Sequence, residues 1–277
     1  MSTELSNDAL KAQVAAQYTK TELKFPTEII DLPSKGLLYP EGHPLRSGMV
    51  EMKYMTAREE DILSTPSLIK KGIVLDKLFE SLIISNGEGV SFNYRDLVLG
   101  DKNAIMVASR VLGYGKLYGV SIIIPKLDDP HEVEIDLTTL KDKEFDEDLF
   151  TEHGNNVPFL LPNSNKQITF KILDGHAEAA IKSDLTRQAK KNTSGIERTN
   201  STRMKHIITS VDGDDSRSTI NDFVDTYLLS SDSILLKEYI QKIQPDVDLR
   251  IKVEIEDEEI SEFFDIPIGI DFFWPGA

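Results

Sequence analysis

Apolar side chains recur with two different periods along this chain, and the changes of period constrain the fold most. Period two, typical of strands with one buried face, occurs before residue 174 and again after residue 245. Between these blocks the spacing is that of amphipathic helices. We therefore predict an α+β fold, with a mixed N-terminal part of short helices and strands, a helical segment, and C-terminal antiparallel strands.

The same pattern predicts four parts of the chain. Residues 1–24 carry few apolar groups and are expected to form a flexible N-terminal arm. An α+β domain is expected over residues 25–173, and a helical segment over residues 174–245. The remaining residues, 246–277, are expected to form strands that join the first sheet.

Two helices of the α+β domain have recognisable starts. Thr56-Ala57-Arg58-Glu59 fits a capping box, in which Thr56 caps the helix and Glu59 reaches back to the cap, and this helix must stop before Pro66. Asp101 is expected to cap a later helix that ends at Gly113.

The helical segment contains four apolar stripes, and Thr219 with Asp222 suggests a second capping box. The stripes are Ala177, Ile181, Leu185 and Ala189; Met204, Ile207, Ile208 and Val211; Ile220, Phe223, Val224, Tyr227 and Leu228; and Leu235, Leu236, Tyr239, Ile240 and Ile243, before Pro245. Because isolated amphipathic helices are marginal in water, these four need a shared core or a partner.

The C-terminus returns to period two. Leu249, Ile251, Val253 and Ile255 alternate with charged residues, and Ile266, Ile268, Ile270 and Phe272 alternate after the acidic run 256–259. These two runs are expected to form a hairpin that ends near Trp274, because Pro275 has no N–H to donate. Phe273 and Trp274 then either cover the core of the protein or dock into a neighbour.

The residues that usually carry chemistry are scarce or wrongly spaced. The chain has no cysteine, so disulfides and thiolate metal sites are excluded. The five histidines, His43, His131, His153, His176 and His206, include no pair three to five residues apart. There is no phosphate-binding glycine loop and no nucleophile elbow. We expect no catalytic residue, no metal site and no cofactor.

Charge gives information about partners. The net charge is −16, which disfavours nucleic acid and anionic membranes as partners. Residues 181–206 nevertheless contain seven Lys and Arg against two acids, and residues 246–271 contain ten acids against two Lys and Arg. This pattern is typical either of solvated surface or of two faces that meet oppositely charged proteins. We take Lys190 and Lys191 as candidate contacts to an acidic protein.

A second candidate contact lies in a loop. Pro33 and Pro40 bracket a segment in which Gly36 permits positive φ, so that Leu37, Leu38 and Tyr39 could be presented to a partner. A rigid loop loses little entropy on docking. The alternative is that these side chains fold back onto the core of their own domain.

Several stretches, taken in order, resemble a known family. They are Leu32-Pro33-Ser34-Lys35-Gly36-Leu37-Leu38-Tyr39-Pro40, Met55-Thr56-Ala57-Arg58-Glu59-Glu60-Asp61-Ile62-Leu63, Gly100-Asp101, Arg110 with Tyr114-Gly115, Asp136-Leu137, Ile168-Thr169-Phe170-Lys171 and Phe272-Phe273-Trp274-Pro275. Together they are similar to the baseplate hub proteins of T4-type contractile-tailed phages, from about residue 30 to the end. Some relatives carry cysteines where this chain has Ile122-Ile123-Ile124-Pro125, so any metal-binding role of those cysteines is missing here.

The resemblance implies a non-catalytic structural or assembly component of the baseplate hub that contacts other hub or tail proteins. Two forms of this role stay open, a permanent subunit of the virion and a chaperone that leaves after assembly. A tail-associated hydrolase would need a pocket with converging polar groups. The expected location is the host cytoplasm during assembly and, for a permanent subunit, the virion tail.

Overall fold

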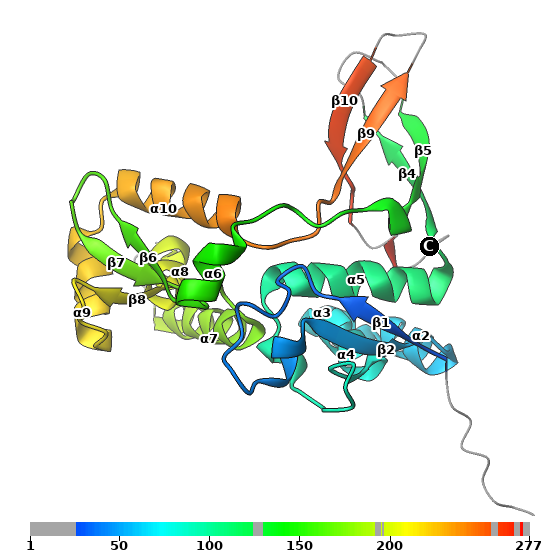
Figure 1. Ribbon diagram of the computed structural model, residues 1–277, viewed down its shortest axis with the longest axis horizontal. Helices are drawn as coiled ribbons and strands as arrows, with labels where there is room; N and C mark the ends of the chain where they lie inside the picture. The colour runs from blue at the N-terminus through cyan, green and yellow to red at the C-terminus, as the bar shows by residue number, and fades with distance from the viewer. Residues whose placement is uncertain are drawn as a thin grey trace, which may run out of the picture.

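The computed structural model describes residues 26–123, 130–191, 195, 197–255, 260–268 and 272–273. Helices predominate in it, and the strands form several small antiparallel sheets, which confirms the predicted α+β class. Figure 1 shows two groups of helices and strands side by side, with a pair of β-ribbons projecting from them.

The first group is built on a three-stranded sheet. Its strands lie in the order β1 (Thr27–Asp31), β2 (Met49–Lys53) and β3 (Ile83–Ser85). The accompanying helices are η1 (Pro44–Ser47), α2 (Ala57–Leu63), α3 (Pro66–Lys71), α4 (Val74–Leu82), η2 (Tyr94–Asp96) and α5 (Leu99–Tyr114). Helix α2 starts after Thr56 and ends before Pro66, as predicted.

The second group surrounds another three-stranded sheet, β6 (Val157–Leu160), β7 (Gln167–Phe170) and β8 (Ile208–Val211). Its helices are α6 (Glu147–His153), α7 (Gly175–Lys191), α8 (Thr199–Ile207), α9 (Arg217–Asp222), the π-helical turn η4 (Phe223–Tyr227) and α10 (Ser230–Ile243). Helix α10 ends two residues before Pro245, as predicted.

Strand β8 corrects the prediction of an uninterrupted helical segment. Ile208 and Val211 were assigned to a helical stripe, but they lie in a strand that pairs antiparallel with β7. The hydroxyl oxygens of Thr169 and Thr209 lie 2.7 Å apart across this pair. The apolar spacing over four residues favours a helix only weakly. Hydrogen bonding to the neighbouring strand β7 stabilises the extended conformation more. Ser216, and not Thr219, caps α9.

The C-terminal strands also differ from the prediction. β9 (Arg250–Ile255) pairs with β10 (Ile260–Asp265) in a sheet of two strands, and neither joins β1–β3 within the described residues. The second strand is therefore Ile260–Asp265, and the described residues 266–268 and 272–273 lie outside strands. Because a tight antiparallel pair can form across the short acidic connection, the hairpin closes earlier than the hydrophobic pattern suggested.

The two projecting ribbons of Figure 1 are β9–β10 and the pair β4 (Leu117–Ile122) and β5 (His131–Asp136), which the turn η3 (Leu137–Thr139) follows. We call these four strands the arm. At its base, the Tyr118 hydroxyl donates to the carbonyl oxygen of Pro267 at 2.9 Å. The segment after β10 thus contacts β4, which lies in the middle of the sequence.

A single cluster of buried side chains connects both groups and the arm. It includes Met52 and Leu78 of the first group, Phe170 and Leu236 of the second, and Tyr118 of the arm. The groups also contact each other through backbone, because α5 passes so close to the segment after α10 that a Cβ on Gly100 would overlap the carbonyl oxygen of Pro245. We therefore describe the protein as one packed body that carries an arm.

Candidate functional site

The proline-bracketed loop is fixed to the body by a buried carboxylate. Asp101, in the first turn of α5, accepts hydrogen bonds from the Ser34 backbone N–H at 2.9 Å, the Ser34 hydroxyl at 2.7 Å and the Tyr39 hydroxyl at 2.5 Å. The Tyr39 hydroxyl in turn accepts from the backbone N–H of Val98 at 3.1 Å. Burial raises the pKa of Asp101 to about 6, although the hydrogen bonds from Tyr39 and Ser34 act in the opposite direction.

This arrangement places the loop against the core of its own domain, which is the second of the two alternatives. Leu38 and Tyr39 are buried in the core, and half-buried Leu37 packs against that core. Asp101 is not the cap of α5, because Val98 occupies the cap position. The apolar side chains of the loop gain more from burial in their own fold than from exposure on a rigid turn.

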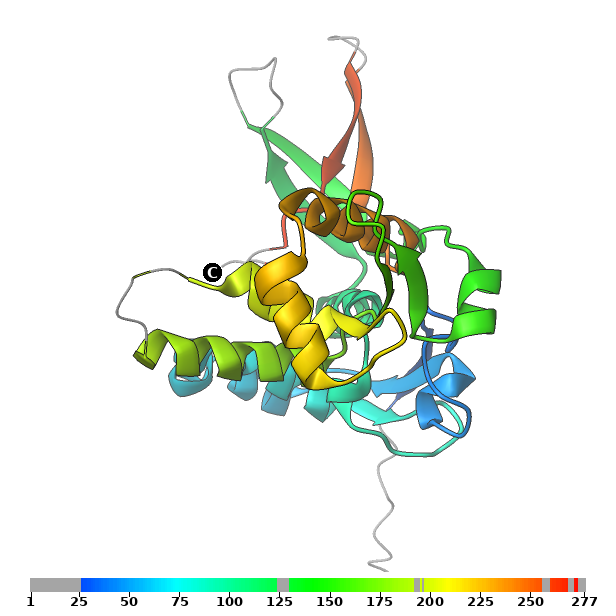
Figure 2. The ribbon, with the colours of Figure 1, turned by 90° about the vertical axis from the view of Figure 1, so that its left-hand side faces the viewer.

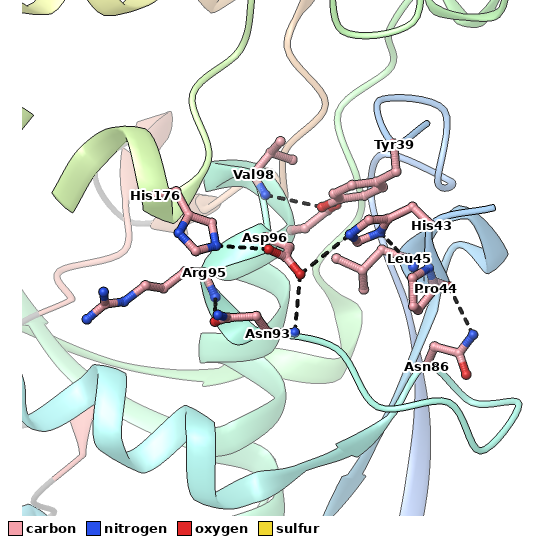
Figure 3. Close-up of polar contacts among 11 residues, drawn as sticks. Tyr39, His43, Pro44, Leu45, Asn86, Asn93, Arg95, Asp96, Val98 and His176 are labelled. Carbon is pink, nitrogen blue, oxygen red and sulfur yellow. Dashed lines mark hydrogen bonds and ion pairs between the residues drawn. The ribbon is translucent and has the colours of Figure 1, made fainter. Parts of the chain in front are cut away.

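A carboxylate between two imidazoles lies beside this loop (Figure 3). The Oδ1 atom of Asp96 lies 2.9 Å from His176 Nε2, and its Oδ2 atom lies 3.4 Å from His43 Nε2. His43 Nδ1 accepts from the backbone N–H of Leu45 at 3.2 Å, and this contact orients Nε2 of the same ring towards Asp96.

The cluster links three segments of the chain. It joins the loop before η1, the turn η2 and the first turn of α7, and Figure 3 shows both imidazoles pointing at Asp96. His176 contacts the Asp96 carboxylate, and His43 contacts both this carboxylate and the backbone N–H of Leu45. No group of three or more His, Asp or Glu in the described parts is arranged to hold a metal ion.

The predicted capping box is present at α2 and extends further than expected. The carboxylate of Glu59 accepts from the Thr56 backbone N–H at 2.9 Å and from the Thr56 hydroxyl at 2.6 Å. Glu59 is fully buried. Its carboxylate also accepts hydrogen bonds from Lys53 Nζ at 2.8 Å and from the Ser81 hydroxyl at 2.7 Å. Burial favours the neutral form, but these hydrogen bonds outweigh it and lower the pKa of Glu59 to about 2.

Helix α7 presents the basic face that the sequence indicated. Lys182, Arg187 and Lys190 are exposed on one side of it, and together with Ala179, Ser183 and Thr186 they line a shallow surface. Figure 2 shows the second half of α7 extending beyond the rest of the second group. Arg187 pairs with Asp184 of the same helix, whereas no carboxylate of the described residues pairs with Lys182 or Lys190. The side chain of Lys191 lies outside the described residues.

A hollow that sequence reasoning missed adjoins this helix. It has a volume of about 200 Å³ and is lined by residues of α5, α7, α8 and α10 and of the segment after β7. Its floor is apolar and its mouth carries cationic side chains. Since the lining residues come from five separate segments, no local sequence signal could have revealed it.

Phe273, for which core packing and docking were both open, is part of the core. Its ring packs against Phe79 with centroids 6.0 Å apart and against Phe272 at 5.1 Å. The other predicted docking aromatic, Trp274, lies outside the described residues. The core alternative therefore holds for Phe273, because a buried ring removes a large apolar surface from water.

No protein-family model, curated protein or solved structure matches this chain. In the described part of the chain, no helix is long and apolar enough to cross a membrane. Several residues that carry the family resemblance hold the fold together, namely Ser34, Tyr39, Glu59, Asp101 and Arg110. The guanidinium of Arg110, for example, donates to the carbonyl oxygens of Gly115 at 3.2 Å and Leu117 at 3.3 Å.

Proposed function

We propose that this protein is a non-catalytic component of the baseplate hub of a contractile phage tail, and that it acts by binding other tail proteins. The hub assignment is supported by the ordered stretches that resemble this family.

The exposed basic face of α7 carries the protein-binding part of the proposal. Lys182 and Lys190 lie on it without a carboxylate partner among the described residues, in a chain of net charge −16. The net charge repels nucleic acid at long range, whereas a local cationic face attracts acidic protein surfaces and increases the association rate. We therefore assign acidic hub or tail proteins as partners.

The test is co-purification from phage-producing cells with a tagged full-length chain. The wild-type protein should bring down tail proteins, and Lys182→Glu with Lys190→Glu should reduce their yield and make the remainder less sensitive to salt. Lys70→Glu with Lys71→Glu is the matched control, because these lysines are exposed at the end of α3. Equal loss for both double variants, or no tail protein with the wild type, would contradict the proposal.

The amount of protein in purified particles separates the two forms of this role. A permanent subunit stays at a fixed copy number per tail after stringent washing. An assembly chaperone is present in tail intermediates and absent from finished particles.

A further inference from the structure

The hollow beside α7 has the size of a single side chain. Its volume of about 200 Å³ is below the range of roughly 300–1,000 Å³ that small-molecule and cofactor sites occupy. Buried Leu173, Met204 and Ile207 line it together with half-buried Ile240. An apolar cavity of this size fits one large apolar side chain better than a cofactor.

The mouth of the hollow is cationic. Lys171, Arg203 and Lys237 line it together with one acid, Glu178. The Arg203 guanidinium donates to the Glu178 carboxylate at 2.5 and 3.3 Å, and Lys237 donates to the neutral amide oxygen of Asn200 at 3.1 Å. Two positive charges therefore remain without a carboxylate among the described residues. These charges favour a partner segment in which acidic residues lie on both sides of the apolar residue that enters the mouth.

The hollow lies next to the basic face of α7. Glu178 lines the hollow, while Ala179 and Lys182 belong to the exposed face, and Lys182 lies one turn further along the same helix. A short segment seated in the hollow can therefore extend along Lys182 towards Lys190. A buried apolar anchor with a charged periphery is the usual anatomy of a protein-binding site.

We propose that this hollow is the anchor site for an acidic segment of a partner protein, which inserts one large apolar side chain between α7, α8 and α10. Carboxylates on both sides of that side chain meet Lys171 and Lys237 at the mouth and Lys182 on α7. The identification of the partner as a protein rests on the proposed function.

A pair of synthetic peptides tests the site directly. Asp-Asp-Glu-Phe-Glu-Asp-Asp is titrated into the full-length chain labelled with ¹³C at its methionine methyl groups, and the Met204 signal is assigned with Met204→Leu. The Met204 methyl should shift saturably, and the peptide with Ala in place of Phe should leave it unshifted. No shift with the Phe peptide, or equal shifts with both, would overturn the proposal.

Leu99→Glu provides the matched variant. Leu99 lies at the mouth, is 44% exposed and begins α5, where an added carboxylate suits the helix dipole, so the fold should be kept. This carboxylate should repel the acidic peptide and weaken its binding about tenfold. Ile69→Glu on α3, which is 48% exposed and outside the hollow, should leave binding unchanged. Equal weakening in both variants would contradict a specific site.

Co-purification of the same variants separates the two proposals. If wild type and Leu99→Glu bring down the same tail proteins in equal yield, the anchor site is wrong and the proposed function stands. If the Phe peptide binds but the wild type brings down no tail protein, the proposed function fails. Light scattering tests whether a second copy of this chain occupies the hollow. Self-association of the wild type that Leu99→Glu abolishes would overturn the assignment to a different protein.

Discussion

At the scale of single residues, two buried carboxylates with opposite pKa shifts hold the N-terminal part together. Asp101 has three hydrogen-bond donors, yet it sits so deep that burial decides the direction and raises its pKa. Glu59 is also buried, but Lys53 supplies a positive charge and lowers its pKa. The difference lies in the presence of an opposite charge, because neutral donors offset only part of the desolvation cost.

The raised pKa of Asp101 predicts a pH dependence. The pKa of Asp101 is about 6 in the folded protein, above its value in the unfolded chain. Protonated Asp101 therefore contributes to the free energy of unfolding below about pH 4, and this contribution is lost as the pH rises through about 6. The wild type should therefore lose stability relative to Asp101→Asn between pH 4 and 7, by on the order of 3 kcal/mol. Urea denaturation of both proteins at unit pH steps measures this. A constant difference would show that Asp101 does not titrate in this window.

The cap of α2 predicts a smaller effect. Thr56→Ala removes the hydroxyl that donates to Glu59 and should lower the free energy of unfolding by roughly 1 kcal/mol. Thr186→Ala is the control, because Thr186 is exposed inside α7 and alanine favours helices there. The urea midpoint should fall for the first variant alone, with an unchanged slope. A urea midpoint of Thr56→Ala equal to that of the wild type would show that the Thr56 cap does not stabilise α2.

At the scale of elements, the contact between α5 and the segment after α10 fixes how the two groups pack. Gly100→Ala would improve helix propensity by about 1 kcal/mol in an isolated helix. In the protein, the added methyl group overlaps the Pro245 carbonyl, so we expect a net loss of about 1–3 kcal/mol. Gly119→Ala in β4, where the added atom meets open space, should be close to neutral. Thermal melting compares the two, and a stabilised Gly100→Ala protein would contradict this packing.

At the scale of the whole molecule, the end of the chain closes the base of the arm. Phe272 packs edge-on against Tyr118 of β4, and Phe273 packs against Phe79 of α4. Tyr118 and Phe79, which lie far apart in the sequence, are therefore joined by the adjacent rings of Phe272 and Phe273.

This arrangement predicts a large cost for Phe273→Ala, about 3–5 kcal/mol, because a buried ring leaves a cavity. Phe263→Ala on β10 should change stability by less than about 0.5 kcal/mol, because Phe263 is 64% exposed. Deletion of residues 273–277 should destabilise the fold in the same way as Phe273→Ala. A truncated chain with wild-type unfolding would instead return Phe273 to the docking role that the sequence first suggested.

The sequence by itself determined the features that few residues encode. The α+β class, the capping box of Thr56 and Glu59 and the end of α10 before Pro245 follow from periodicity and local hydrogen bonding. The exposed Lys190 on α7 follows from local charge. Tertiary structure alone decided the rest. β8 is a strand because β7 lies beside it, and Asp101 is a buried acceptor because Ser34, 67 residues away, folds onto it. The hollow beside α7 exists because five segments meet there, and such contacts between distant residues leave no periodic trace in a sequence.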